Sequence, residues 1–316
     1  MKLIKNTLSL AVLSVLATPA FAETDVDFYG KANVTLQNSN DGEGEGSYSE
    51  VKSNASRLGV KGSHKINDDL SVIFKAEFQV NWASGEKDGA SIDDRNQYLG
   101  LKGNFGEVVF GNNDSVLKQS QGKVDLFNDL NGDIKHLFKG ENRVEQSVTY
   151  KTPSYSGFQG GVTYITEDSD HGKSDGDAAY SLAVTYGDAK LKKSKVYAGV
   201  AYDNGVKGYK VARATVQGRL GAFVLGGMLQ KQEKEDGSDE ATGYMVSGKY
   251  AVNKQIALKL QYQGLDVKDG EDKKGASVGA DYKLSSAAKV FVFYTTADVN
   301  SEDKQKYAAL GMEYKF

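Results

Sequence analysis

Apolar and polar residues alternate along almost the whole chain, in segments of about ten residues that Gly, Asn and Asp separate. One such segment covers residues 69–82. Its apolar face carries Leu70, Val72, Phe74, Ala76, Phe78, Val80 and Trp82, and its other face carries Ser71, Ile73, Lys75, Glu77, Gln79 and Asn81. Residues 253–264, 275–284 and 308–316 repeat the pattern. A period of two is typical of β-strands and not of helices, so the sequence predicts an all-β chain.

The chain contains about sixteen of these predicted strands. They start near Val26, Ser53, Asp69, Asn96, Glu107, Arg143, Gly157, Ala178, Lys195, Tyr209, Gly221, Ala241, Asn253, Gly275, Ala288 and Ala308. The connections alternate between short turns (103–106, 187–189, 219–221, 252–254 and 285–287) and longer, mostly acidic loops (38–51, 83–93, 167–177, 233–240, 267–274 and 299–303). Short turns at one end and long polar loops at the other are typical of a transmembrane antiparallel β-barrel.

Residues 112–143 interrupt the alternation. They read NNDSVLKQSQGKVDLFNDLNGDIKHLFKGENR, and three acids (Asp125, Asp129, Asp133) recur there at four-residue spacing. A long insertion without a strand pattern is usually functional or disordered. Its isolated apolar residues indicate that it packs against another part of the protein. We therefore expect a loop that folds into the mouth or the lumen of the barrel.

Residues 1–22 have the composition of a signal peptide. Lys2 and Lys5 precede an apolar stretch at 8–17, and the segment ends in Ala20-Phe21-Ala22, a small-x-small cleavage pattern. We expect the mature chain to be residues 23–316, a single exported domain without an internal boundary. Removing two lysines leaves 37 basic and 42 acidic residues, a formal charge of −5.

The composition argues against several functional classes. The chain has no cysteine, which excludes disulfides and thiolate metal sites. Its three histidines (His64, His136, His171) lack ligand spacing, and no nucleophile motif accompanies them. No basic block suggests nucleic acid. We therefore expect neither a cofactor, nor a metal, nor catalysis.

A soluble sandwich and an outer-membrane barrel could both contain such strands. Three observations favour the barrel. The first is the predicted signal peptide in a chain without cysteine. The second is the recurrence of Tyr and Phe near strand ends, where aromatic girdles lie at a membrane interface. The third is the presence of mid-strand charges such as Lys75 and Glu77, which a water-filled lumen tolerates.

Several motifs, in their order along the chain, resemble the general bacterial porins, which are trimeric sixteen-stranded diffusion channels of Gram-negative outer membranes. The motifs are Asp27-Phe28-Tyr29-Gly30-Lys31-Ala32, Ser56-Arg57-Leu58-Gly59-Val60-Lys61-Gly62, Tyr98-Leu99-Gly100-Leu101-Lys102-Gly103, Ser147-Val148-Thr149-Tyr150 with Pro153, and the terminal Tyr314-Lys315-Phe316. The resemblance implies short periplasmic turns, long extracellular loops, a homotrimer, and recognition of Phe316 by the barrel-assembly machinery.

The same resemblance implies that the third loop folds inward and forms the narrowest part of a pore. A basic wall would then consist of Lys31, Arg57, Arg95 and Arg143, facing the acids Asp125, Asp129 and Asp133. The family often has Pro-Glu-Phe-Gly-Gly-Asp in this loop, where this chain has Asn128-Asp129-Leu130-Asn131-Gly132-Asp133. The missing proline leaves the path of the loop and the pore width open.

Charged walls in a constriction select solutes by size and charge, because low-dielectric surroundings focus the field between them. The expected function is passive diffusion of ions and small hydrophilic solutes. A substrate-specific channel of the sugar type and a surface adhesin are the alternatives. Asp129, Asn131 and Gly132 resemble part of a calcium loop, but Phe127 and Phe138 would occupy its first and twelfth ligand positions. The acidic outer loops could contact divalent cations that bridge lipopolysaccharide. The sign of the ion preference is left open.

Overall fold

The computed structural model describes residues 24–44, 46–83, 92–167, 170, 177–299 and 303–316. The predicted signal peptide, residues 1–22, and His171 lie outside these ranges. Within them, one antiparallel sheet contains all the strands. The strands are β1 (Thr24–Asn40), β2 (Tyr48–Ser53), β3 (Arg57–Asn67), β4 (Leu70–Val80), β5 (Ile92–Gly103), β6 (Gly106–Asp114), β7 (Arg143–Lys151), β8 (Phe158–Ile165), β9 (Ala179–Gly187), β10 (Val196–Val206), β11 (Tyr209–Leu220), β12 (Phe223–Lys234), β13 (Ala241–Ala251), β14 (Ile256–Val267), β15 (Lys273–Lys283), β16 (Ala288–Asp298) and β17 (Gln305–Lys315).

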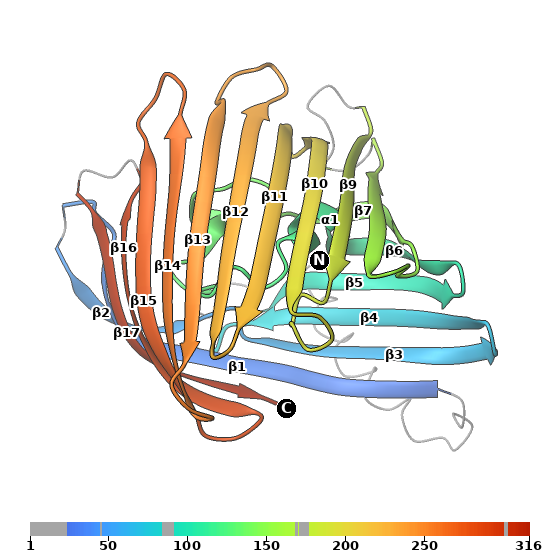
Figure 1. Cartoon of the computed structure of the whole chain (residues 1–316), viewed down its shortest axis with the longest axis horizontal. Coiled ribbons are helices and arrows are strands. Elements are labelled where there is room, and N and C mark those ends of the chain that lie inside the picture. The colour runs from blue at the N-terminus through green and yellow to red at the C-terminus, as the bar shows by residue number, and fades with distance from the viewer. Residues whose placement is uncertain (1–23, 45, 84–91, 168–169, 171–176, 300–302) are drawn as a thin grey trace, which may run out of the picture.

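The sheet closes on itself because β1 pairs with β17, from Lys31 opposite Lys315 to Asn40 opposite Lys306. Both β2 and β3 pair with β1, one after the other along its length. They form one barrel strand that is interrupted at residues 54–56. The seventeen described strands therefore make sixteen barrel strands, which confirms the predicted all-β fold. Figure 1 shows β10–β14 on the near wall, crossing the more distant β3–β5 at a large angle.

The connections alternate as predicted, with two exceptions. On the side of the short turns, the connection between β9 and β10, which we expected at 187–189, spans residues 188–195. The turn between β10 and β11 lies at the end of the long loops but contains only Lys207 and Gly208. Both residues have positive φ, 53° and 73°. This is the geometry of a tight hairpin turn whose twist matches that of the flanking strands.

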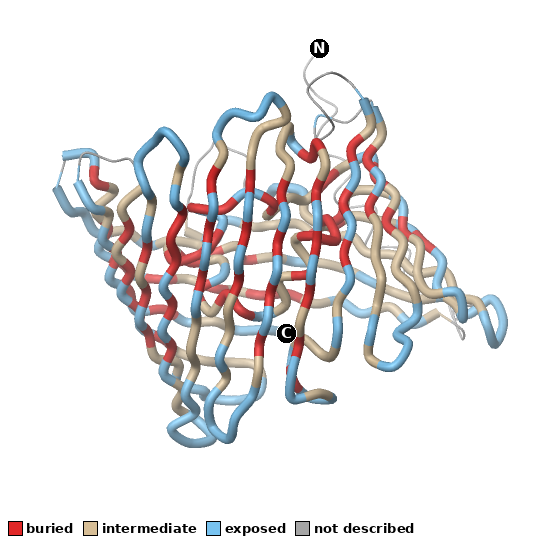
Figure 2. Tube along the Cα trace, turned by 45° about the horizontal axis from the view of Figure 1, so that its top comes forward, coloured by how far each residue is buried: buried red, intermediate tan, exposed pale blue. Residues whose placement is uncertain are grey.

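The two faces of each strand differ as the sequence alternation indicates. Along β10, Val196, Val200 and Tyr202 point outward and are exposed, whereas Tyr197 and Asp203 point inward and are buried. Buried and exposed positions alternate in the same way along β10–β14 in Figure 2. The outer face is largely apolar, as a surface in contact with lipid requires.

Two short helical elements lie between β6 and β7, namely α1 (Val116–Ser120) and the 3₁₀ turn η2 (Ile134–His136). Within the described ranges, no helix is long and apolar enough to span a membrane.

Replacing an outward side chain by a charge should destabilise the barrel. Leu229 of β12 is 64% exposed on the outer face. Leu229→Arg should lower the free energy of unfolding by about 2–4 kcal/mol, because the guanidinium would lie in hydrocarbon. Denaturant unfolding in lipid vesicles measures the change. Leu229→Met is the control, with a loss below about 1.5 kcal/mol. Equal stability of the two variants would contradict an outward, lipid-facing position.

Candidate functional site

The third long connection crosses the inside of the barrel. It runs from Ser115 to Asn142, within the predicted range 112–143. Figure 1 shows it with α1 between the near and far walls. Ser115 starts α1 as its N-cap, and its Oγ accepts a hydrogen bond from the backbone N–H of Lys118 at 3.2 Å. Asp133 caps η2 in the same way through Lys135 N, at 2.9 Å.

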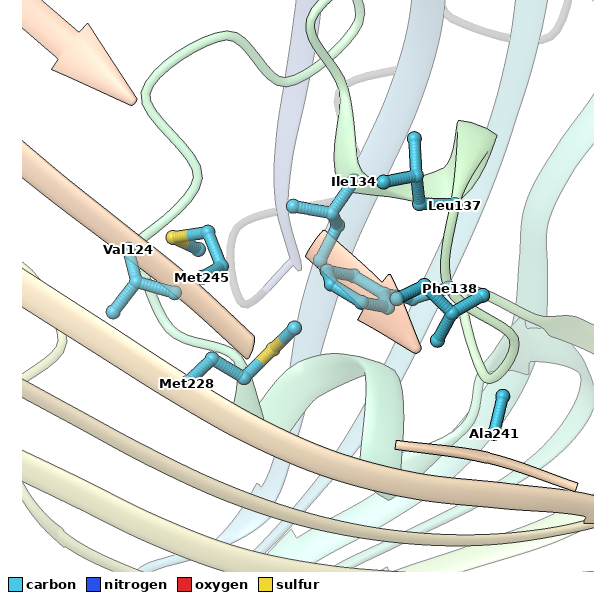
Figure 3. Packing of buried hydrophobic residues seen from close by; sticks show 8 residues of the cluster. Val124, Ile134, Leu137, Phe138, Met228, Ala241 and Met245 are labelled. Atoms are coloured by element: carbon cyan, nitrogen blue, oxygen red, sulfur yellow. The ribbon is translucent and has the colours of Figure 1, made fainter. Parts of the chain in front are cut away.

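The loop is held on the inner wall by three apolar clusters. The first joins α1 to β9–β11 and consists of Val116, Leu117, Ala183, Ala201 and Val211. The second joins the middle of the loop to β12–β14 and consists of Val124, Ile134, Leu137, Phe138, Met228, Ala241, Met245 and Leu265. The third joins the tip of the loop to β16 and β17 and consists of Phe127, Leu130, Phe291, Phe293, Tyr307 and Ala309. Figure 3 shows the second cluster. Where the loop lies, the inner wall of β9–β17 therefore carries apolar residues in place of the polar ones that usually line a barrel lumen.

Polar contacts and a glycine also fix the loop on this wall. The side chain of Gln261 bonds both limbs of the loop, accepting from Leu126 N at 2.8 Å and donating to Gly132 O at 3.0 Å. A Cβ at Gly243 would collide with the ring of Phe138, so only glycine allows this close approach.

Asp125 is buried inside the loop and does not reach the basic wall. Its two carboxylate oxygens accept hydrogen bonds from Phe127 N at 2.9 Å and Ile134 N at 3.2 Å. Burial, followed by the neighbouring charge of Asp133, raises the pKa of Asp125 above its ordinary value, and the two backbone N–H groups only partly offset this. Both oxygens of this carboxyl point to backbone donors of the loop, so it does not face the lumen.

Asp133 is also turned into the loop. Its carboxylate accepts from Asp129 N at 2.8 Å as well as from Lys135 N. The expectation that Asp125 and Asp133 face the basic wall is therefore replaced by a structural role. The loop's own backbone donors need acceptors once they leave water, and these two carboxylates supply them.

Asp129 is the acid that meets the predicted basic residues. Its Oδ2 lies 2.6 Å from both Lys31 Nζ and Arg57 Nη2. Burial alone would raise its pKa, but the charges of Lys31 and then Arg57 lower the pKa of Asp129 to about 2. Its backbone has a φ of 69°, a conformation that Asp tolerates better than most residues.

Glu77 of β4 organises the neighbouring cations, although the sequence did not mark it as a site residue. Its carboxylate lies 2.7 Å from Arg95 Nε, 3.3 Å from Lys75 Nζ and 3.8 Å from Arg57 Nη1. Tyr29 Oη donates to it at 2.8 Å. The available signal was the pair of mid-strand charges, Lys75 and Glu77, on the polar face.

A bulge turns Arg95 into the lumen. Outward residues of β5 are Leu99 and Leu101, and strict alternation from them would point Arg95 outward as well. The register between β4 and β5 shifts so that Arg95 and Asn96 together lie opposite Glu77. An extra residue of this kind re-aims the side chains that follow it.

Arg143 belongs to the same wall but has a different partner. Its Nη2 lies 3.2 Å from Asp114 Oδ1, and its Nε donates to the side chain of Asn96. Lys118 of α1 contacts the same Asp114 oxygen at 3.0 Å. The structure thus brings Lys31, Arg57 and Asp129 into direct contact and links Arg95 to them through Glu77, while Arg143 pairs separately.

The charges along this wall do not balance. Among the described residues, the ion-pair network of Glu77, Asp114 and Asp129 joins six cations to these three carboxylates. The cations are Lys31, Arg57, Lys75, Arg95, Lys118 and Arg143. Across the barrel, Lys259 and Lys289 share Asp281 at 2.9 and 3.1 Å, and Lys315 pairs with the nearby Glu313 at 2.9 Å, which gives three cations and two carboxylates. Both groups therefore carry a surplus of positive charge.

The described residues offer no group of three or more His, Asp or Glu side chains arranged to hold a metal ion. Asp129, the first acid of the calcium-like stretch, is engaged by Lys31 and Arg57 instead.

Comparison with known proteins identifies the family. The sequence profile of the Gram-negative porin family matches residues 9–302. The chain belongs to the Gram-negative porins. Membership places this porin in the outer membrane as a multi-pass barrel.

Curated relatives of this porin include major outer membrane proteins P.IB. The protein from Neisseria meningitidis serogroup B (serotype 15, strain H44/76) is 24% identical over 316 residues, which covers 90% of this chain and 91% of the relative. The protein from Neisseria lactamica is 31% identical over 177 residues, 51% of this chain and 50% of the relative. With Neisseria sicca the identity is 28% over 171 residues, covering 51% of this chain and 47% of the relative. The porin thus spans about half the length of several curated relatives that it matches.

Solved structures share the fold of this porin. An anion-selective porin from Comamonas acidovorans superposes with a TM-score of 0.73 at 18% identity, covering 93% of this chain and 100% of the other. Salmonella typhi OmpF in complex with daunomycin gives 0.78 at 17% identity, covering 93% and 98%. The trimer form of Vibrio cholerae OmpT gives 0.67 at 19% identity, covering 93% and 99%.

The loop of this porin should detach when its aromatic anchor is removed. Phe127 is fully buried against Phe291 and Phe293. Phe127→Ala should weaken loop docking by about 3–5 kcal/mol, because it removes a buried ring and leaves a cavity. Amide hydrogen exchange of residues 115–142 measures this loss as faster exchange. Tyr155→Ala is the control, because that ring is 83% exposed in a turn. Unchanged loop protection in Phe127→Ala would show that the clusters do not hold the loop.

Proposed function

We propose that this porin forms a water-filled channel for passive diffusion of ions and small hydrophilic solutes across the outer membrane. The observation that carries the proposal is the docked loop inside a closed barrel, with Asp129 reaching the basic wall of β1 and β3. The loop reduces the cross-section of the lumen, so it would set the size limit. The charged groups beside it would set the ion preference.

We infer that the channel prefers anions. Direct contact of Asp129 with Lys31 and Arg57 neutralises part of the basic wall. The electric field in the lumen therefore does not arise mainly from an acidic surface that faces a basic surface across an open gap. The remaining surplus of cations on that wall, and of lysines on the wall of β14–β16, makes the waist positive. Apolar walls of low dielectric strengthen this potential. The net negative charge of the whole chain acts from farther away and is screened by salt.

The oligomeric state of this porin and its binding partners are also proposals. We expect a homotrimer, as in the trimer form of Vibrio cholerae OmpT. Tyr314 and Phe316 stack with ring centroids 5.6 Å apart and are exposed on the outer face, where the barrel-assembly machinery could bind them. The acidic outer loops would contact lipopolysaccharide through divalent cations.

Diffusion requires no chemical step from the protein, and we infer that the porin is not an enzyme. His64 bonds Thr24 Oγ1 at 2.8 Å on the exposed surface near the chain start, away from the docked loop that contains His136. Two histidines in such separate places do not form a hydrolytic centre.

The proposal predicts different effects for two neighbouring acids. In planar-bilayer recordings under a KCl gradient, the wild-type reversal potential should indicate anion preference. Asp129→Asn should move it further in the same direction, because a negative charge leaves the waist. Asp125→Asn should leave it nearly unchanged and instead lower thermal stability, since one backbone N–H loses its acceptor. Cation preference in the wild type, or an equal shift in both variants, would refute this assignment.

The contact of Asp129 with Lys31 and Arg57 should break within a narrow range of acidic pH. The pKa of Asp129 is lowered to about 2, so the contact with Lys31 and Arg57 is complete above the ordinary aspartate pKa of about 3.9 and is lost as the pH falls through 2. Reversal potentials measured between pH 7 and pH 1.5 should therefore show a shift toward anions near pH 2. Asp129→Asn should lack this component. A midpoint near pH 4 in its place would contradict the ion pair.

A further inference from the structure

A second lumenal feature lies on the turn side of the docked loop. It is a partly open cavity of about 540 Å³ between α1 and the inner faces of β7–β10, and the turn 188–195 forms one of its sides. In Figure 1, α1 lies behind β10 and above this turn. The cavity lies away from the Asp129 contact and plays no part in the constriction described above. Its volume is that of a typical small-molecule site.

Four lysines line the cavity, namely Lys151, Lys190, Lys192 and Lys193. None of them has an ion pair within 4 Å in the part of the chain that the structure describes. This differs from the waist, where Lys31, Arg57, Arg95 and Arg143 are all paired with carboxylates.

The acid that lines the cavity is already engaged. Asp188 accepts hydrogen bonds from the backbone N–H groups of Lys190, Lys192 and Lys193 at 2.9, 2.9 and 3.1 Å. These contacts shape the turn and direct the carboxylate toward backbone donors. Among the described residues, the four ammonium groups thus have no direct ion pair, and the cavity lining carries four lysines against the single carboxylate of Asp188.

The centre of the turn packs against the barrel, while the side chains of Lys190, Lys192 and Lys193 are exposed. Leu191, at its centre, is only 5% exposed. Tyr197, which follows the turn, donates from Oη to Ser120 O of the docked loop at 2.9 Å. Lys123 of that loop also interacts electrostatically with the turn. Burial, and then the positive charge of Lys190, lower the pKa of Lys123. The lysines thus act on the same aqueous space as the loop.

We propose that this cavity is a binding site for multivalent oxyanions, the class that includes phosphate esters and polycarboxylates. Several ammonium groups, each with three donors, suit an anion that carries more than one charge and many acceptor oxygens. Gln119 and Gln159 also line the cavity. Each amide already donates one N–H to a backbone carbonyl, to Asp114 O at 2.6 Å and to Thr152 O at 3.0 Å, which leaves its second N–H as a neutral donor. A monovalent anion such as chloride would gain much less from several lysines at once. The site rests on the proposed channel function, since solutes would reach it through the lumen.

The test uses the purified full-length porin in detergent and in planar bilayers, with pyrophosphate and citrate as probes. Calorimetry should detect binding of at least one probe at low salt and weaker binding at high salt. In recordings, the probe should reduce KCl conductance at lower concentration from the turn side. The triple variant Lys190→Gln, Lys192→Gln, Lys193→Gln should weaken binding at least about tenfold.

A matched control exists at the same end of the barrel. Lys249, Lys254 and Lys283 line another cavity, of about 370 Å³, together with Lys289, Lys315 and the carboxylates of Asp281 and Glu313. The triple Gln variant of Lys249, Lys254 and Lys283 removes the same charge. It should weaken binding by less than about threefold, because these lysines do not line the cavity beneath α1 and act on an anion there only at long range through solvent.

The outcomes separate the site from the channel. Binding of pyrophosphate alone would indicate a phosphate ligand, and binding of both probes would indicate recognition by charge number; both results support the site. No binding of either probe, or equal weakening in the two triple variants, would overturn it. Calorimetric binding without conductance would refute the proposed channel and leave the site supported.

Discussion

Closure of the sheet through the pairing of β1 with β17 is the constraint on which the rest of the molecule depends. In hydrocarbon an unpaired N–H or C=O group costs several kcal/mol, so a sheet that crosses a membrane cannot keep an open edge. Closure gives every strand an outer face toward lipid and an inner face toward a lumen. Anything that narrows the passage must then be attached to the inner wall.

Attachment of the loop explains where the inner wall departs from the strand pattern. The sequence shows inward apolar residues on the strands β9–β17, such as Val211, Met228 and Phe293, where a water-filled lumen would favour polar ones. These residues receive the apolar side chains of the loop, and Gly243 leaves room for Phe138. Among the described residues, the three clusters that hold the loop include none from β1–β7, and that wall carries the charged network around Asp129 and Glu77. Hydrophobic contact on one side therefore determines which charges remain accessible to solutes on the other.

The charges of the lumen fall into two electrostatic environments. At the waist, cations and carboxylates are paired within a partly buried network, which orders the side chains and leaves a modest positive surplus. Toward the turns, lysines line the cavity beneath α1 without carboxylate partners among the described residues. Side chains in ion pairs are fixed by their protein partners, whereas lysines without such partners are available to bind a ligand. This difference could not be inferred from the residue types alone.

The sequence by itself determined the alternation of the two faces and predicted about sixteen strands and an inward loop, because these follow from the two-residue period and its interruption at residues 112–143. The expectation that Lys31, Arg57, Arg95 and Arg143 form a basic wall came from the resemblance to porin motifs, and strict alternation would have pointed Arg95 outward. Only the tertiary structure decided that Asp129 meets the basic wall while Asp125 and Asp133 bond the loop backbone, that Glu77 links Arg57 to Arg95, and that a bulge turns Arg95 inward. The partners Lys31 and Asp129 are 98 residues apart, so their contact depends on the path of a loop that is held by packing against distant strands.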